Sequence, residues 1–119
     1  MFSLSMPFFY FMFTYNITFA LATDKENEFI DYLRRKFIPA IFGSESAARN
    51  PKLKKVVEIG GEKPHPEHGL SIALSAEFPS VETAHVWNNH TLAPALKEFH
   101  LKFGQHALFF ATLLENITI

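Results

Sequence analysis

The chain has 119 residues, of which 48% are hydrophobic and 19% charged, so it is long enough for one globular domain and too short for two. Its formal net charge of −1 provides no overall electrostatic attraction to nucleic acid or to anionic lipid. The absence of cysteine excludes disulfides and thiolate chemistry and leaves the redox compartment open.

The first 23 residues carry no charged side chain, so a secretory signal peptide and a membrane anchor both have to be weighed. A signal peptide normally has a basic residue before its apolar run, and Pro7 and Asn16 would interrupt a membrane helix. From Thr14 to Leu21, polar and apolar residues alternate, which favours a half-buried strand. We therefore expect residues 1–11 to be an N-terminal extension upstream of a second possible start at Met12, and residues 12–119 to form one domain.

The segment 24–41 is predicted to be helical. Thr23 or Asp24 can cap its start, and acidic residues in the first turn suit the helix dipole. Pro39 is expected to kink or end the helix. Its apolar residues recur at the spacing of one helical face: Phe29, Ile30, Leu33, Phe37, Ile38 and Ile41.

Two strands are predicted next, paired antiparallel. Residues 52–59 suit a sheet edge because several lysines face outward, with Leu53, Val57 and Ile59 facing inward. In residues 69–78, large apolar residues from Leu70 to Phe78 alternate with small or polar ones. This alternation predicts a central strand with large apolar residues on one face and small or polar residues on the other.

A second helix should begin at its cap, Ser80, and present Val81, Ala84 and Trp87 on one face. The polar run 88–90 and Pro94 predict a break in this helix. Its apolar face then resumes as Leu92, Leu96, Phe99 and Phe103, and Gly104 ends it. A last strand over about 106–115 is apolar on both faces.

The order strand–helix–strand–strand–helix–strand predicts an α+β, ferredoxin-like fold with both helices on one face of an antiparallel sheet. In this topology the first and third strands are central and the last strand is at an edge. An edge strand that is apolar on both faces, beside an uncovered sheet face of small residues, indicates a surface that a partner covers. We therefore predict a homodimer, through the open sheet face and the last strand, in which two sheets face each other as a dimeric α/β barrel.

Several short motifs resemble a bacterial family of short proteins known as a domain of unknown function. That family is related to the ferredoxin-like dimeric α/β-barrel superfamily. The resemblance spans 12 to about 117, and the motifs that carry it are Tyr15-Asn-Ile-Thr, Ile38-Pro39, Leu70-Ser-Ile-Ala-Leu, Phe103-Gly104 and Thr112-Leu-Leu-Glu. It implies the fold and dimerisation and brings no catalytic residue with it. The residues before Met12 depart from the family pattern.

The polar face of the central strands is the best candidate site. Its predicted lining is Asn16, Thr18, Ser71, Ser75 and, from the second helix, Trp87. In proteins that the resemblance suggests, small ligands bind between this face and neighbouring helices. Asn16 could polarise a carbonyl or enolate oxygen, whereas the simpler interpretation is that small residues let two sheets pack closely. No acid–base pair stands beside these residues, so no catalytic residue is assigned.

Other candidate sites are weaker. His65, Glu67 and His68 supply only part of a zinc site, so neither a metal nor a cofactor is expected. The basic stretch from Arg34 to Lys55 could bind an anion or RNA, but the exposed positions of the central strands carry no aromatic residue on which bases could stack. We therefore expect neither a nucleic-acid partner nor a membrane partner.

The function predicted from these features is a small cytoplasmic interaction or regulatory module whose main partner is itself. The alternative is a cofactor-independent enzyme or binder of a small organic ligand, monooxygenase-like or isomerase-like as the resemblance implies, with its site on the open sheet face. The two hypotheses differ in what fills the space against that face.

Overall fold

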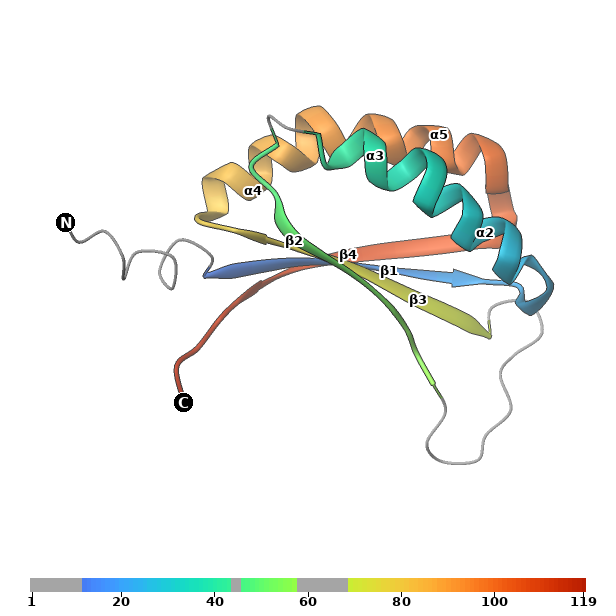
Figure 1. Cartoon of the computed structure of the whole chain (residues 1–119), viewed down its shortest axis with the longest axis horizontal. Helices are drawn as coiled ribbons and strands as arrows, with labels where there is room; N and C mark the ends of the chain where they lie inside the picture. Colours follow the sequence, from blue (N-terminus) through green and yellow to red (C-terminus); the bar gives the residue numbers. More distant parts are fainter. Residues whose placement is uncertain (1–11, 44–45, 58–68) are drawn as a thin grey trace.

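The computed structural model describes residues 12–43, 46–57 and 69–119. The helices of these residues lie together as one layer over one face of the sheet, and none of them lies on the opposite face (Figure 1). The expectations for residues 1–11, for Ile59 and for the stretch 65–68 fall outside the described residues. In chain order the elements are β1 (Phe13–Leu21), a 3-10 turn (Thr23–Lys25), α2 (Glu26–Tyr32), a π-helical turn (Leu33–Phe37), α3 (Ile38–Ile41), β2 (Arg49–Lys55), β3 (Leu70–Phe78), α4 (Val81–Trp87), a second π-helical turn (Asn88–Leu92), α5 (Ala93–Phe103), a 3-10 turn (Gly104–His106) and β4 (Ala107–Glu115).

The sheet has the order β2-β3-β1-β4, and every neighbouring pair is antiparallel. This confirms the predicted ferredoxin-like α+β fold, with the first and third strands at the centre. Ile17 lies opposite Leu74, and Phe19 lies opposite Ile72. Because opposite residues share a face, the large apolar side chains of both central strands point toward the helices.

The core between sheet and helices is unusually aromatic. Phe99 of α5 is 1% exposed, and its ring centroid lies 5.0 Å from that of Phe19 and 5.6 Å from that of Phe29. Most of these ring pairs meet edge to face, the arrangement that aromatic quadrupoles favour. The phenylalanines predicted to form the core on the two helices, Phe29, Phe37, Phe99 and Phe103, are all buried.

The prediction for the second strand was wrong at both ends and in the burial of the Val57 side chain. The strand begins at Arg49, three residues early, and the pairing passes Pro51 through an irregularity at which Asn50 has a φ of 52°. Val57 is 69% exposed because it lies beyond the strand's last residue, Lys55, where β2 has curved away from the helical layer (Figure 1). An edge strand tolerates proline because one side of its backbone has no ladder to complete.

The second helix does not break at Pro94, contrary to the prediction, and the first helix does not end at Pro39 but continues to Ile41. In each case the preceding residue donates its backbone N–H to the carbonyl five residues earlier: Ile38 to Leu33, and Ala93 to Asn88. The wider π-helical turn contains one extra residue. We attribute the continuity of both helices to this turn, which moves aside the carbonyl that the proline ring would otherwise strike.

The predicted cap of the second helix is confirmed. The Ser80 hydroxyl accepts the backbone N–H of Thr83 at 3.1 Å, and the Thr83 hydroxyl accepts the backbone N–H of Ser80. Val81 does not share the buried face as expected: it is 40% exposed because, as the first residue of α4, it lies at the end of the helical layer. Gly104 ends α5 as predicted, with a φ of 56° that suits glycine.

Candidate functional site

The uncovered face of the sheet is small and polar at its centre. On β1 the side chains facing away from the helices are Thr14, Asn16, Thr18 and Ala20, and on β3 they are Ser71, Ala73, Ser75 and Glu77. Asn16 lies opposite Ser75. Its amide nitrogen donates to the hydroxyl of Thr18 at 3.1 Å, which fixes the orientation of the amide along the strand.

The two edges of this face differ sharply in chemistry. On β4, Leu108, Phe110 and Leu114 are 55%, 62% and 51% exposed. They lie opposite residues of the polar set on β1, so they belong to the same face. On the other edge, β2 contributes exposed Lys52 and Lys54, which pair with Ser75 and Ala73. The open face thus runs from an apolar edge, through a centre of small residues, to a basic edge.

The structure brings four of the five predicted site residues to this face, namely Asn16, Thr18, Ser71 and Ser75, all half-buried. Trp87 lies on the opposite side of the sheet, because α4 covers the other face. It is 4% exposed, its ring lies 5.5 Å from Tyr15, and its indole N–H donates to the carbonyl of Ile41 at 3.0 Å. Trp87 therefore has a core position and cannot line a cavity with the other four.

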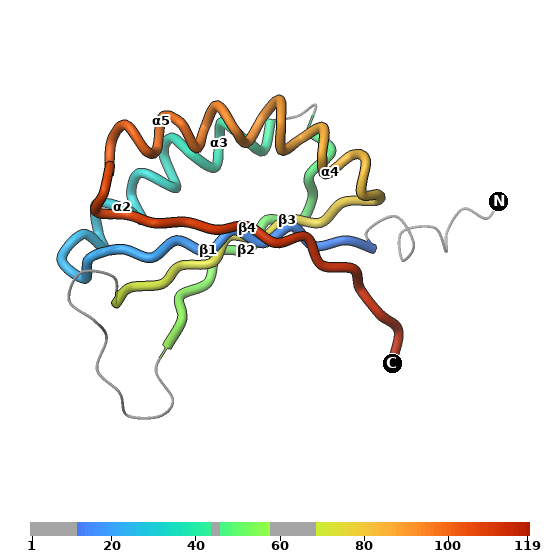
Figure 2. Tube along the Cα trace, turned by 180° about the vertical axis from the view of Figure 1, so that it is seen from behind, coloured from blue at the N-terminus to red at the C-terminus, as the bar shows by residue number. Residues whose placement is uncertain are grey.

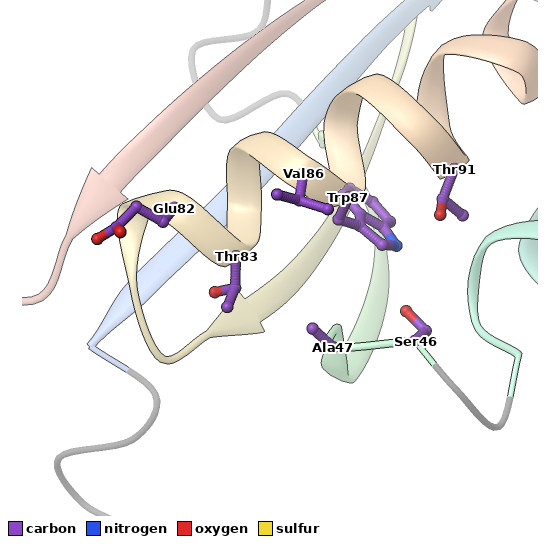
Figure 3. Close-up of a pocket in the computed structure, with 7 residues that line it drawn as sticks. All are labelled: Ser46, Ala47, Glu82, Thr83, Val86, Trp87 and Thr91. Carbon is purple, nitrogen blue, oxygen red and sulfur yellow. The ribbon is translucent and has the colours of Figure 1, made fainter.

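A cavity of about 290 Å³ lies on the outer side of α4, against the segment that precedes β2 (Figure 3). Ser46 and Ala47 face the helix across it, and Val86 and Trp87 form its helical wall. Polar groups around this cavity already have hydrogen-bond partners within the protein: the Thr83 hydroxyl donates to the carbonyl of Ser80, and the Ser46 hydroxyl accepts the N–H of Ala48.

A second cavity, of about 200 Å³, lies between α4 and the strands β1 and β4. The Tyr15 phenol donates to the amide oxygen of Asn88 at its edge, and His85 lies one helical turn before Asn88. Burial raises the pKa of the Tyr15 phenol above its ordinary value, so the phenol keeps its proton near neutral pH. We did not predict this group, because nothing in the sequence places Tyr15 beside a residue 73 positions away.

A third cavity, of about 500 Å³, lies on the outer surface of the helices and is lined by Ala40, His90, Thr91, Pro94, Ala95, Lys97 and Glu98. Within the described ranges, no three histidine, aspartate or glutamate side chains gather closely enough to hold a metal ion. In that same part of the chain, every helix is too short or too polar to cross a membrane.

The topology and the single helical layer define the class of protein as a ferredoxin-like α+β domain. The chain belongs to the family of the domain of unknown function DUF4286, whose model matches residues 12–117. No curated protein matches the chain in sequence.

Solved structures similar to the chain share its fold at low sequence identity. A protein of the EthD family from Bacillus halodurans has a TM-score of 0.64 and 13% identity, covering 89% of this chain and all of the other. SnoaB, a cofactor-independent oxygenase from Streptomyces nogalater, has a TM-score of 0.59 and 10% identity over 91% of this chain and 96% of the other. A dimeric ferredoxin-like protein from an uncultured marine organism has a TM-score of 0.55 and 11% identity over 90% of this chain and 96% of the other. At such identities these likenesses show the fold alone.

Proposed function

We propose that this domain, residues 12–119, is an interaction module whose partner is a second copy of itself. The observation that carries the proposal is the exposure of Leu108, Phe110 and Leu114 on the same face as the small residues of β1 and β3. Apolar side chains gathered on one strand of an uncovered sheet lose unfavourable contact with water when another surface covers them. The dimeric state of a ferredoxin-like structural neighbour supports the formation of a dimer.

The centre of the open face suits a second sheet. Two sheets pack face to face at a spacing of about 10 Å, which large side chains on both sheets would fill. Small side chains leave room for the two sheets to approach each other closely. Here the central positions are serine, threonine, alanine and asparagine. A small organic ligand held between the sheets by Asn16, Thr18, Ser71 and Ser75 is compatible with this assembly.

A two-fold axis parallel to the strands would also join the free edges. It places β2 of one copy beside β4 of the partner, running antiparallel, because β2 and β4 run in opposite directions within one chain. The start of β2, at Arg49, then lies near the partner's Glu115, and exposed Val56 and Val57 lie near the partner's Leu108. At one end of this strand pair the opposite charges of Arg49 and Glu115 lie close together, and at the other end the apolar side chains of Val56, Val57 and Leu108 do. An axis across the strands would instead set Lys52 and Lys54 against their own copies.

Figure 2 shows the molecule from behind, with all helices on one side of the sheet. The segment after β4 turns toward the uncovered side, and so does the end of β2. Ile117 and Ile119 of that C-terminal segment are 83% and fully exposed. These two segments extend the surface on which a second copy would rest.

Cysteine cross-linking tests this arrangement, and the chain contains no cysteine that could interfere. The double variant Val57→Cys/Leu108→Cys, treated with a short bismaleimide, is expected to give a covalent dimer on a denaturing gel. Within one copy, β2 and β4 are three strand spacings apart, about 14 Å, which a short spacer cannot cross.

Each single cysteine variant should remain a monomer on the gel, and Leu101→Cys/Leu108→Cys is the matched control, because Leu101 lies on α5. A protein that is dimeric in solution but gives no covalent dimer with the Val57/Leu108 pair would contradict the proposed arrangement of the edges.

A further inference from the structure

The cavity between α4, β1 and β4 differs from the other two in the polar groups that it presents. Its lining residues are Tyr15, Ala84, His85, Asn88, Ala111, Thr112 and Leu113. None of these is a lysine, arginine, aspartate or glutamate, so the cavity has no fixed charge. Its apolar part comes from Ala84, Ala111 and Leu113.

The polar groups of this cavity are held in place by their neighbours. The Tyr15 ring packs edge to face on Trp87 at 5.5 Å and on Phe78 at 6.3 Å. The Asn88 amide accepts the phenol proton through its oxygen, while its nitrogen donates to the side chain of Asn89 at 3.1 Å. Rigid groups bind a ligand at a smaller entropic cost than mobile ones.

Each of these groups still has unused hydrogen-bonding capacity. The phenol oxygen of Tyr15 has donated its only proton and can accept a hydrogen bond. The amide nitrogen of Asn88 has two protons, of which Asn89 takes one. The exposed imidazole of His85 adds a further polar group at the same place. A donor and an acceptor therefore stand beside an apolar wall.

We propose that this cavity binds a small uncharged molecule that has a hydrogen-bond donor and an acceptor next to an apolar ring. A volume of about 200 Å³ admits a molecule of one ring and is below the usual range for drug-sized ligands. The absence of fixed charge in the lining disfavours a charged ligand, which would lose its hydration without gaining a counter-charge. The site lies on the helical side of the sheet, so it does not depend on the proposed dimer.

Benzamide is a suitable probe, because its amide donates and accepts beside one aromatic ring. In a titration of the full-length 15N-labelled protein, we expect saturable shifts of the Asn88 side-chain amide and of the backbone amides of residues 84–88 and 111–113. So small a ligand should bind with a dissociation constant of about a millimolar.

Two variants make the assignment specific. Ala111→Leu fills the cavity from an exposed position on β4, so the protein should fold and the shifts should disappear. Tyr15→Phe removes the acceptor and should weaken binding about fivefold. Val86→Ala, on the cavity at the outer side of α4, is the control and should leave the affinity unchanged.

The proposal is overturned by the absence of saturable shifts up to the solubility limit of benzamide. Shifts confined to residues 46–47 and 91, or an affinity that Ala111→Leu leaves unchanged, would overturn it as well. The mass of the Ala111→Leu protein in solution is measured in parallel, so that a failure of the ligand site is distinguished from a failure of the dimer.

Discussion

Phe110→Glu is expected to convert the proposed dimer to a monomer at micromolar concentration. Phe110 is 62% exposed in a single copy, and the proposed assembly buries it in both subunits. Full burial of an exposed phenylalanine contributes about 1.5–3 kcal/mol, so losing the burial of the 62% exposed side chain in both copies raises the dissociation constant by about one to three powers of ten. The buried carboxylate adds a further desolvation penalty. Size-exclusion chromatography with light scattering should report a mass near 13.6 kDa.

Leu101→Glu is the matched control for this variant. Leu101 is 77% exposed, but it lies on α5, away from the open sheet face. The same charge introduced there should leave the dimer intact. If both glutamate variants stay dimeric, or if both dissociate, the open face is not the interface.

Phe99→Ala is expected to cause a large loss of stability, about 3–5 kcal/mol in the free energy of unfolding. Phe99 is 1% exposed and its ring contacts Phe19, Phe29 and Phe103 at centroid distances of 5.0, 5.6 and 4.9 Å. Its removal leaves a cavity at the point where α5 packs on both β1 and α2. The surrounding rings cannot all move to fill it.

Urea unfolding followed by circular dichroism measures this effect, at one fixed protein concentration because dimerisation would add to the apparent stability. Phe109→Ala is the control: Phe109 contacts the same cluster but is 39% exposed, so its loss should be less than half as large. Equal losses for the two variants would contradict the placement of Phe99 at the centre of the core.

The alternation of residue types in β1 and β3 predicted the sheet, because a period of two assigns every second residue to the core. The same reasoning failed at β2. There Asn50-Pro51 is a pair of residues typical of a turn, yet the strand continues through these two residues with an irregular register. An edge strand has a neighbour on one side only, so its sequence constrains its bounds less tightly.

The helices show a similar limit. We predicted a break from the polar run 88–90 and Pro94. The buried residues Trp87 and Leu92 are five positions apart, a spacing that does not fit an α-helical turn. A π-helical turn accommodates five residues without a break, and the proline at position 94 marks its end. The five-residue spacing between apolar residues, together with a proline two residues beyond it, was the signal in the sequence that could have indicated the π-helical turn.

The candidate site was predictable only where strands supplied it. Asn16, Thr18, Ser71 and Ser75 followed from the two-residue period, whereas Trp87 depended on which face α4 covers. The Tyr15–Asn88 pair depends on the packing of α4 over β1, which residue spacing within either element does not determine.

Native mass spectrometry of the full-length chain is the most direct test of the central claim, that a second copy covers the open face. We expect a species of twice 13.6 kDa at micromolar concentration. A defined additional mass on that dimer would identify a small molecule held by it. A monomer throughout the accessible concentration range would contradict the proposed homodimer.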